Sequence, residues 1–259
     1  MKHRDSNTED DCVSLANVGG SSPVVLVCEH ASNAIPARFD GLGLLAEDRK
    51  SHAAWDPGAL GVAQSLSRHH EAPLVSSRIS RLVYDCNRPP EAPDAMPERS
   101  EIIDVPGNKN LSAFDRSARV ETFYLPFRAA LSRTIEQISR PIIVTVHSFT
   151  PVYHGELRTV EIGILHDSDT RLADAMLETA RAHTRAEVLR NKPYGPEHGV
   201  THTLKEHAIR DGHLNVMLEI RNDLIVSADQ QENLGAMIAG WVVEAVGLVR
   251  VEGDVKCHA

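Results

Sequence analysis

Several apolar, largely β-branched runs of the sequence end abruptly at an ionisable residue. The three clearest junctions are Val24–Cys28 followed by Glu29 and His30, Ile142–Val146 followed by His147, and Val216–Leu218 followed by Glu219. An apolar run without alternation predicts a strand that is buried on both faces. The carboxyl ends of such strands form the ligand crevice of an open α/β sheet. We therefore expect the sheet to bring His30, His147 and Glu219 to one rim.

Further strands alternate with amphipathic helices along the chain. Strands are predicted at Ala72–Ser77, Leu82–Cys86, Val160–Leu165 and Ala186–Arg190. Helices are predicted to start after a cap at Asp56, at the capping box Ser112-x-x-Asp115, near Thr170, at a second box Thr203-x-x-Glu206 and near Ala228. This alternation, without a break in composition, indicates an α/β fold with a mostly parallel sheet covered on both faces.

The N-terminal segment and two loops depart from this pattern. Residues 1–20 are polar, end in Gly-Gly and are predicted to be disordered or loosely attached, which leaves residues 21–259 as a single domain. Pro89–Asn110 and Asn191–Val200 are long polar segments, and they are candidates for a lid over the site.

Composition and charge exclude several classes of function. The net charge of -9 at pH 7 comes without a block of Lys or Arg, so nucleic acid is not an expected partner. No apolar run approaches the roughly 20 residues of a membrane-spanning helix. The first residues lack the apolar core of a secretory signal, which predicts a cytoplasmic protein. The four cysteines are too far apart to suggest a zinc ribbon or a disulfide framework.

His30 and His147 are candidate metal ligands, because neutral imidazole is a common ligand of zinc. The alternative for each is a partly buried imidazole with ordinary hydrogen bonds. A catalytic zinc needs three protein ligands and an open position. The sequence leaves the third ligand open among Asn33, Glu29 and Asp56, and Asp56 fits a helix cap equally well.

Glu219 is a candidate for moving protons. A carboxylate beside a metal-bound water can take its proton and later pass it to a leaving amine. The alternative role of Glu219 is an ion pair with Arg221 at the edge of the sheet.

Arginines cluster in the segment SSRISRLVYDCNRPP, which contains Arg81 and the pair Asn87-Arg88. A guanidinium is a planar fork that matches a carboxylate in bidentate fashion. The cluster therefore indicates a binding site for an anionic substrate. The alternative is ion pairing with Asp85 and with the acidic loop Glu91–Glu101.

Six segments taken together resemble a known family. They are CEHASN, WDPG, SRLVYDCNRP, VTVHSF, THTLKEHA and LEIRNDLI, spread from about Val24 to Ile225. As a set they are similar to the N-formylglutamate amidohydrolases, a family distantly similar to the zinc carboxypeptidases and the acyl-amino-acid deacylases. The resemblance implies a three-layer α/β/α sandwich of the phosphorylase/hydrolase-like type. It also implies a divalent metal ion, with zinc as the first candidate. It also implies hydrolysis of the amide of a small anionic N-acyl amino acid such as N-formylglutamate.

The resemblance assigns roles to individual residues. It gives metal binding to His30 and His147, the general base to Glu219, and the grip on the substrate carboxylate to Asn87, Arg88 and Arg81. Wider relatives have His-x-x-Glu where this chain has His30-x-x-Asn33, and neutral Asn is a poor zinc ligand. Asp56 and Glu29 are the substitutes that the resemblance leaves.

Two other functions remain open from the sequence. One is a deacylase for a different N-acyl amino acid. The other belongs to another class, a non-catalytic protein that binds small anions on a degenerate hydrolase scaffold. The sequence predicts neither the acyl group nor the oligomeric state.

Overall fold

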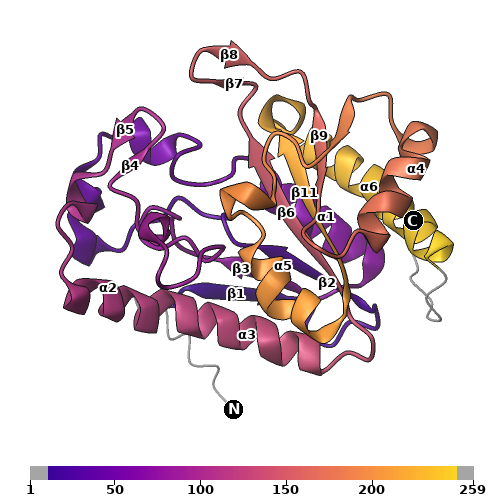
Figure 1. The fold of residues 1–259 in the computed structure, drawn as a ribbon, viewed down its shortest axis with the longest axis horizontal. Helices are drawn as coiled ribbons and strands as arrows, with labels where there is room; N and C mark the ends of the chain where they lie inside the picture. The colour runs from indigo at the N-terminus through magenta and orange to yellow at the C-terminus, as the bar shows by residue number, and fades with distance from the viewer. Residues whose placement is uncertain (1–10, 250–259) are drawn as a thin grey trace.

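The computed structural model describes residues 11–249 of the chain. Its strands are β1 (Val13–Ala16), β2 (Val24–Cys28), β3 (Leu74–Ser77), β4 (Arg99–Ser100), β5 (Ile103–Asp104), β6 (Ile142–Phe149), β7 (Val152–Tyr153), β8 (Glu156–Leu157), β9 (Ile162–Leu165), β10 (Val188–Arg190) and β11 (Leu214–Arg221). Its α-helices are α1 (Ala59–His70), α2 (Ala113–Arg119), α3 (Leu125–Glu136), α4 (Arg171–His183), α5 (His202–His207) and α6 (Ala228–Leu248). A π-helical turn, Val120–Tyr124, joins α2 to α3 along the lower edge of the molecule in Figure 1.

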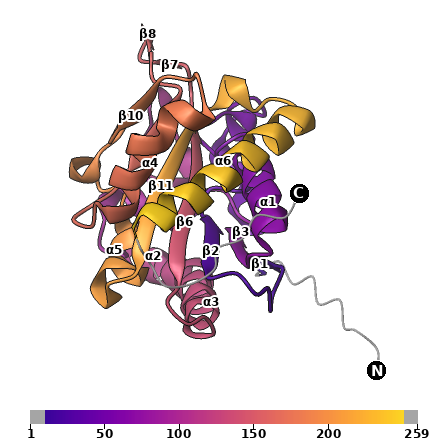
Figure 2. The ribbon, with the colours of Figure 1, turned by 90° about the vertical axis from the view of Figure 1, so that its right-hand side faces the viewer.

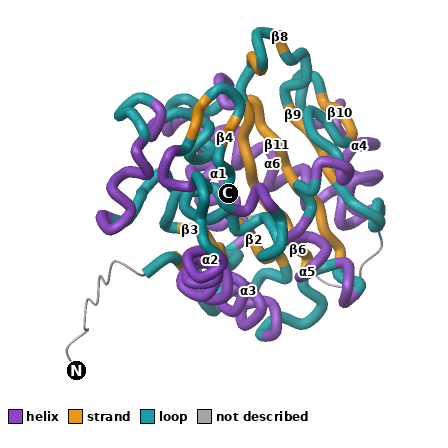
Figure 3. Tube along the Cα trace, turned by 60° about the vertical axis from the view of Figure 1, so that its left-hand side comes forward, coloured by secondary structure: helices purple, strands orange, loops and turns teal. Residues whose placement is uncertain are grey.

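A seven-stranded mixed sheet forms the centre of the molecule, in the order β1-β3-β2-β6-β11-β9-β10. The four strands β3, β2, β6 and β11 are parallel to one another. At one side β1 is antiparallel to β3, and at the other β9 is antiparallel to β11 and parallel to β10. The α/β class with a mostly parallel sheet is confirmed, and Figure 3 shows the strands enclosed by helices and loops.

Successive residues of the central strands face two different hydrophobic cores. On β2, Val24 and Leu26 belong to the core shared with α1, α4 and α6, whereas Val25 and Val27 belong to the core shared with α3. Every residue of β2 is buried, as expected of a strand covered on both faces. Figure 2 shows α1, α4 and α6 lying across one face of the sheet. The predicted three-layer sandwich is confirmed.

The first described residues differ from the expectation. Val13–Ala16, which the sequence places in a loosely attached tail, form β1 and pair with β3, from Val13 opposite Ser77 to Ala16 opposite Leu74. For this part of residues 1–20 the prediction is wrong, and residues 1–10 lie outside the described residues. β1 is a short edge strand that is largely exposed, so its sequence lacks the apolar pattern of a buried strand.

The predicted strand Leu82–Cys86 is also wrong. The segment forms turns, and the amide of Val83 donates to the carbonyl of Ser80. Its apolar side chains are fully buried in the core beside α3. Apolar residues here reflect burial of a turn and not pairing in a sheet.

Two predicted helix starts differ as well. α1 has Gly58 as its N-cap, in a left-handed conformation with φ of 83°, so Asp56 does not cap it. α5 has Thr201 as its N-cap, so the expected box from Thr203 does not form. The box predicted at the start of α2 is confirmed.

Two short hairpins extend from the carboxyl end of the sheet. β4 and β5 lie within the long loop Pro89–Asn110, and β7 and β8 follow β6 at the top of Figure 1. Within residues 11–249, no helix is long and apolar enough to cross a membrane.

Candidate active site

The carboxyl ends of three parallel strands open into one pocket. His30 follows β2, His147 lies in the last part of β6, and Glu219 lies opposite His147 on β11. All three side chains line the pocket and are nearly buried, with exposed fractions of 4%, 2% and 5%. The structure therefore brings together the three residues that the sequence predicts at one rim.

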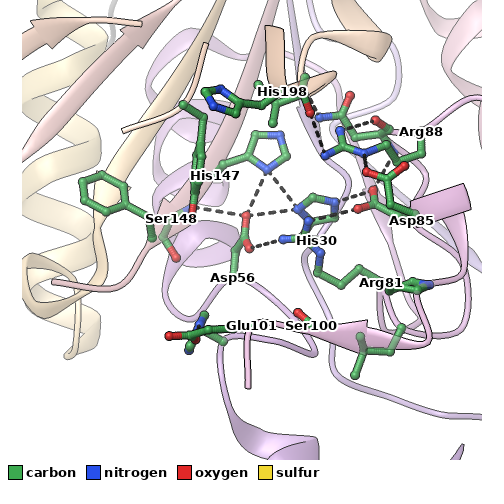
Figure 4. Close-up of a pocket in the computed structure, with 18 of the residues that line it drawn as sticks. His30, Asp56, Arg81, Asp85, Arg88, Ser100, Glu101, His147, Ser148 and His198 are labelled. Atoms are coloured by element: carbon green, nitrogen blue, oxygen red, sulfur yellow. Dashed lines mark hydrogen bonds and ion pairs between the residues drawn. The ribbon is translucent and has the colours of Figure 1, made fainter. Parts of the chain in front are cut away.

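His30, His147 and Asp56 direct one ligand atom each toward a common point, as Figure 4 shows. The Nδ1 atoms of His30 and His147 are 3.2 Å apart. Oδ2 of Asp56 lies 3.3 Å from Nδ1 of His30 and 2.9 Å from Nδ1 of His147. Zinc bonds of about 2.0–2.1 Å in a tetrahedron separate ligand atoms by about 3.3 Å. The donor set and its spacing therefore fit a zinc ion held by three protein ligands.

A second carboxylate lies behind each histidine. Nε2 of His30 is 2.7 Å from Oδ1 of Asp85, and Nε2 of His147 is 3.2 Å from Oε2 of Glu29. Asp85 can accept the Nε2 proton of His30, so that Nδ1 of His30 keeps its lone pair for a metal, whereas Glu29 lies at ion-pair distance from His147 without a hydrogen bond. Burial lowers the pKa of both histidines, but the surrounding carboxylates outweigh it and raise both values. The carboxylates thus give the site a negative electrostatic potential, which is suited to binding a cation.

Asp56 is fixed by contacts from several elements. Its Oδ2 accepts a hydrogen bond of 3.2 Å from the amide of Ser148 in β6, and Arg81 lies 3.5 Å from its Oδ1. Burial alone would raise the pKa of Asp56. The effect of His30 and His147 is larger and lowers this pKa below its usual value, so the carboxyl stays ionised. Of the three residues left open as a third ligand, Asp56 joins the two histidines. Glu29 lies behind His147.

Asn33 lies away from these ligand atoms. Its side-chain amide donates to the carbonyl of Arg49 at 3.0 Å, and it does not line the pocket.

Glu219 is a buried pocket carboxylate with a raised pKa. Its Oε2 is buried and has no hydrogen-bond partner among residues 11–249. Burial raises the pKa of Glu219 to about 7, and the charge of Asp56 adds to the rise, against the lowering effect of His147. A carboxyl with a pKa near neutrality is suited to taking up and releasing a proton.

The three residues expected to grip a carboxylate all line the pocket, but they differ in their contacts. Arg81 forms ion pairs with Asp56 and Asp85 and keeps 29% of its side chain exposed. Arg88 donates to Asp94 at 2.7 Å and to the carbonyl of Gly199 at 2.6 Å, and it is more deeply buried.

Asn87 bridges the same wall of the pocket. Its Nδ2 donates to the carbonyl of Val200 at 2.6 Å, and its Oδ1 accepts from the amide of Thr203 at 3.0 Å. Asn87 and Arg88 thus attach the loop before α5 to the pocket.

Both loops predicted as lids contribute to the pocket wall. Their lining residues are Asp94, Pro97, Arg99, Ser100, Glu101, Tyr194, His198 and Val200. Asp85 and Tyr194 also line the pocket, although the sequence indicates Asp85 only as an ion-pair partner for the arginines and gives no role to Tyr194. Asp85 could have been found from its position beside the Asn87-Arg88 pair, whereas nothing in the sequence around Tyr194 points to the site.

Comparison with known proteins adds a family match. Residues 22–226 match the family model described as N-formylglutamate amidohydrolase. No curated protein sequence matches the chain.

Solved structures share the fold. The crystal structure of a gene product from Agrobacterium tumefaciens is similar with a TM-score of 0.91 and 51% sequence identity, over 94% of this chain and 98% of that chain. N-formylglutamate amidohydrolase from Ralstonia eutropha is similar with a TM-score of 0.62 and 17% identity, over 92% of this chain and 97% of that chain. At 17% identity the second likeness shows the fold alone.

Proposed function

The chain belongs to the N-formylglutamate amidohydrolase family, and we propose that it is a divalent-metal-dependent enzyme that hydrolyses an N-acyl amino acid. N-formylglutamate is the first candidate substrate, and zinc is the first candidate metal. The observation that carries the metal dependence is the convergence of His30 Nδ1, His147 Nδ1 and Asp56 Oδ2 to within 3.3 Å of one another.

Two carboxylates support the ligands in this proposal. Asp85 holds the proton of the His30 imidazole on Nε2, and the negative charge of Glu29, 3.2 Å from Nε2 of His147, favours the same tautomer there, so that both Nδ1 atoms face the metal position. When bound, the divalent cation would polarise the acyl oxygen and acidify a water molecule.

Glu219 is the proton carrier of the proposed reaction. It accepts a proton from the attacking water, whose oxygen forms the new bond to the acyl carbon. It then returns that proton to the amide nitrogen as the C–N bond breaks, which releases formate and the free amino acid. Its raised pKa favours both halves of this transfer.

Arg81 is proposed to bind the substrate carboxylate, because its guanidinium stays partly exposed in the pocket. The same role for Asn87 and Arg88 remains a prediction from the family resemblance. It would require these two residues to exchange their contacts with Gly199 and Val200 for contacts with substrate.

A substrate panel tests the proposed function. The metal-loaded protein is incubated with the formyl, acetyl and succinyl derivatives of glutamate, aspartate and glutamine, and the free amino acid is measured. We expect the highest kcat/KM for N-formylglutamate. A preference for another acyl group would identify a different deacylase, and binding of these anions without hydrolysis would support the non-catalytic alternative.

The cytoplasmic location stays a prediction from the sequence.

A further inference from the structure

Arg158 is a cation beside the pocket with no acidic partner among residues 11–249. Its guanidinium lies 4.4 Å from the ring centroid of Tyr153, 4.9 Å from that of Tyr194 and 5.5 Å from that of Phe149. These three aromatic residues line the pocket, so Arg158 stands directly behind its wall. In the described part of the chain, no carboxylate lies within ion-pair distance of Arg158.

The three arginines that line the pocket, Arg81, Arg88 and Arg99, each have an acidic partner within the protein. The positive charge of Arg158 is therefore the one most available to attract an anion into this side of the pocket.

Tyr194 connects Arg158 to the pocket. Nη2 of Arg158 donates to the hydroxyl oxygen of Tyr194 at 3.0 Å. Because that oxygen acts as an acceptor, the phenolic proton remains available for another acceptor. Within residues 11–249 this hydroxyl has no other hydrogen-bond partner. Burial and the negative charge of Glu219 raise the pKa of Tyr194, so the phenol keeps its proton.

Gly163 allows the segment that carries Tyr194 to lie close to Glu219. A Cβ at position 163 would be 1.9 Å from the carbonyl oxygen of Lys192 and 3.1 Å from Cβ of Glu219. Gly163 is also the register partner of Glu219 on the antiparallel neighbour β9. The absence of a side chain at position 163 therefore brings the backbone just before Tyr194 against the strand end where Glu219 lies.

Two of the three residues expected to bind a substrate carboxylate, Asn87 and Arg88, already donate to acceptors within the protein. Asn87 donates its amide to Val200, and Arg88 donates to Asp94, Gly199 and two more backbone carbonyls. Tyr194 keeps a free donor in the same pocket.

We propose that Tyr194, held by Arg158, is a substrate-binding residue that donates a hydrogen bond to a carboxylate of the bound amino acid. Arg81 binds the same ligand by charge, and Arg158 acts through Tyr194 by orienting its hydroxyl and adding positive potential. This inference rests on the proposed function, because it takes an N-acyl amino acid or its product as the ligand.

Calorimetric titration of the metal-loaded protein tests this proposal without relying on turnover. The ligands are glutamate, glutamine and isoglutamine, since each amide lacks one of the two carboxylates of glutamate. We expect Tyr194→Phe to weaken glutamate binding by about ten- to a hundredfold. The preference for glutamate over one of the two amides should fall by a similar factor, which identifies the carboxylate that Tyr194 binds.

Two further variants complete the design. Tyr124→Phe is the matched control, because the hydroxyl of Tyr124 bonds to Nε2 of His202 at 2.8 Å and does not line the pocket. It should bind all three ligands as the wild type does. Arg158→Met should change the preference for glutamate in the same direction as Tyr194→Phe.

Several outcomes would overturn the inference. They are unchanged glutamate binding by Tyr194→Phe, an equal loss for all three ligands, or a wild type that does not prefer glutamate to either amide. If the wild type shows the expected preferences but hydrolyses no N-acyl amino acid, the proposed function fails and the inference stands. If the wild type hydrolyses them and Tyr194→Phe keeps its preferences, the inference alone fails.

Discussion

Glu219 and His147 lie directly opposite each other on the neighbouring parallel strands β11 and β6. The pairing of two central strands therefore places the proposed proton carrier beside a proposed metal ligand. Side chains alternate between the two faces of a strand, so a shift of this register by one residue would turn Glu219 away from the pocket. The arrangement depends on two buried apolar strands, not on a flexible loop.

Replacement of Glu219 tests the role of proton carrier. Glu219→Gln keeps the shape of the side chain but cannot accept a proton, so we expect kcat to fall by about 10²- to 10⁴-fold. The metal content should stay at the wild-type level, because Glu219 is not among the three converging ligand residues. Glu244→Gln is the control, since Glu244 pairs with His183 and neither residue lines the pocket. Unchanged turnover in Glu219→Gln would refute the role.

The raised pKa of Glu219 predicts the pH dependence of activity. Burial places this pKa at about 7, and the carboxyl is a base only above it. As pH falls through this region Glu219 becomes protonated, so kcat/KM should fall about tenfold per pH unit. The positive charge of a bound cation favours the ionised form and moves the midpoint to a lower pH. A pH profile of kcat/KM measures this limb, and activity that rises toward acid pH would contradict the assignment.

Asp85 is expected to control metal affinity through His30. Asp85→Asn removes the negative charge of the carboxylate that lies 2.7 Å from Nε2 of His30. That carboxylate keeps the imidazole proton on Nε2, so the variant no longer favours the tautomer that binds metal through Nδ1. We expect the metal dissociation constant to rise by about ten- to a hundredfold. Competition with a coloured chelator measures it. Asp174→Asn, on the exposed side of α4, should leave the constant unchanged, and equal affinities for both variants would show that Asp85 does not support the site.

The central part of the fold was predictable because it follows from local patterns. The strands that carry His30, His147 and Glu219 are apolar on both faces, and such runs are read from sequence without knowledge of their partners. Parallel strands that end at the same edge then bring their last residues together. The predicted rim depends only on these two steps.

Other parts of the site depend on contacts between distant segments. Asp56 precedes a helix, and its position in the sequence suits a cap as well as a ligand. The left-handed Gly58 takes the cap position and leaves Asp56 beside His147, which is 91 residues away. Asp85 lies in a buried turn and Tyr194 in a half-buried loop, and neither segment has a periodic pattern. Their roles follow from tertiary packing.

Metal content measures the central claim most directly. The protein is purified without added metal and analysed by elemental mass spectrometry, together with His30→Ala, His147→Ala and Asp56→Ala. His183→Ala is the matched control, because His183 lies on α4 and pairs with Glu244. We expect about one zinc per wild-type and His183→Ala chain, and a large loss of zinc in the other three variants. A wild-type protein that contains no divalent metal and takes up none when it is added would contradict the account.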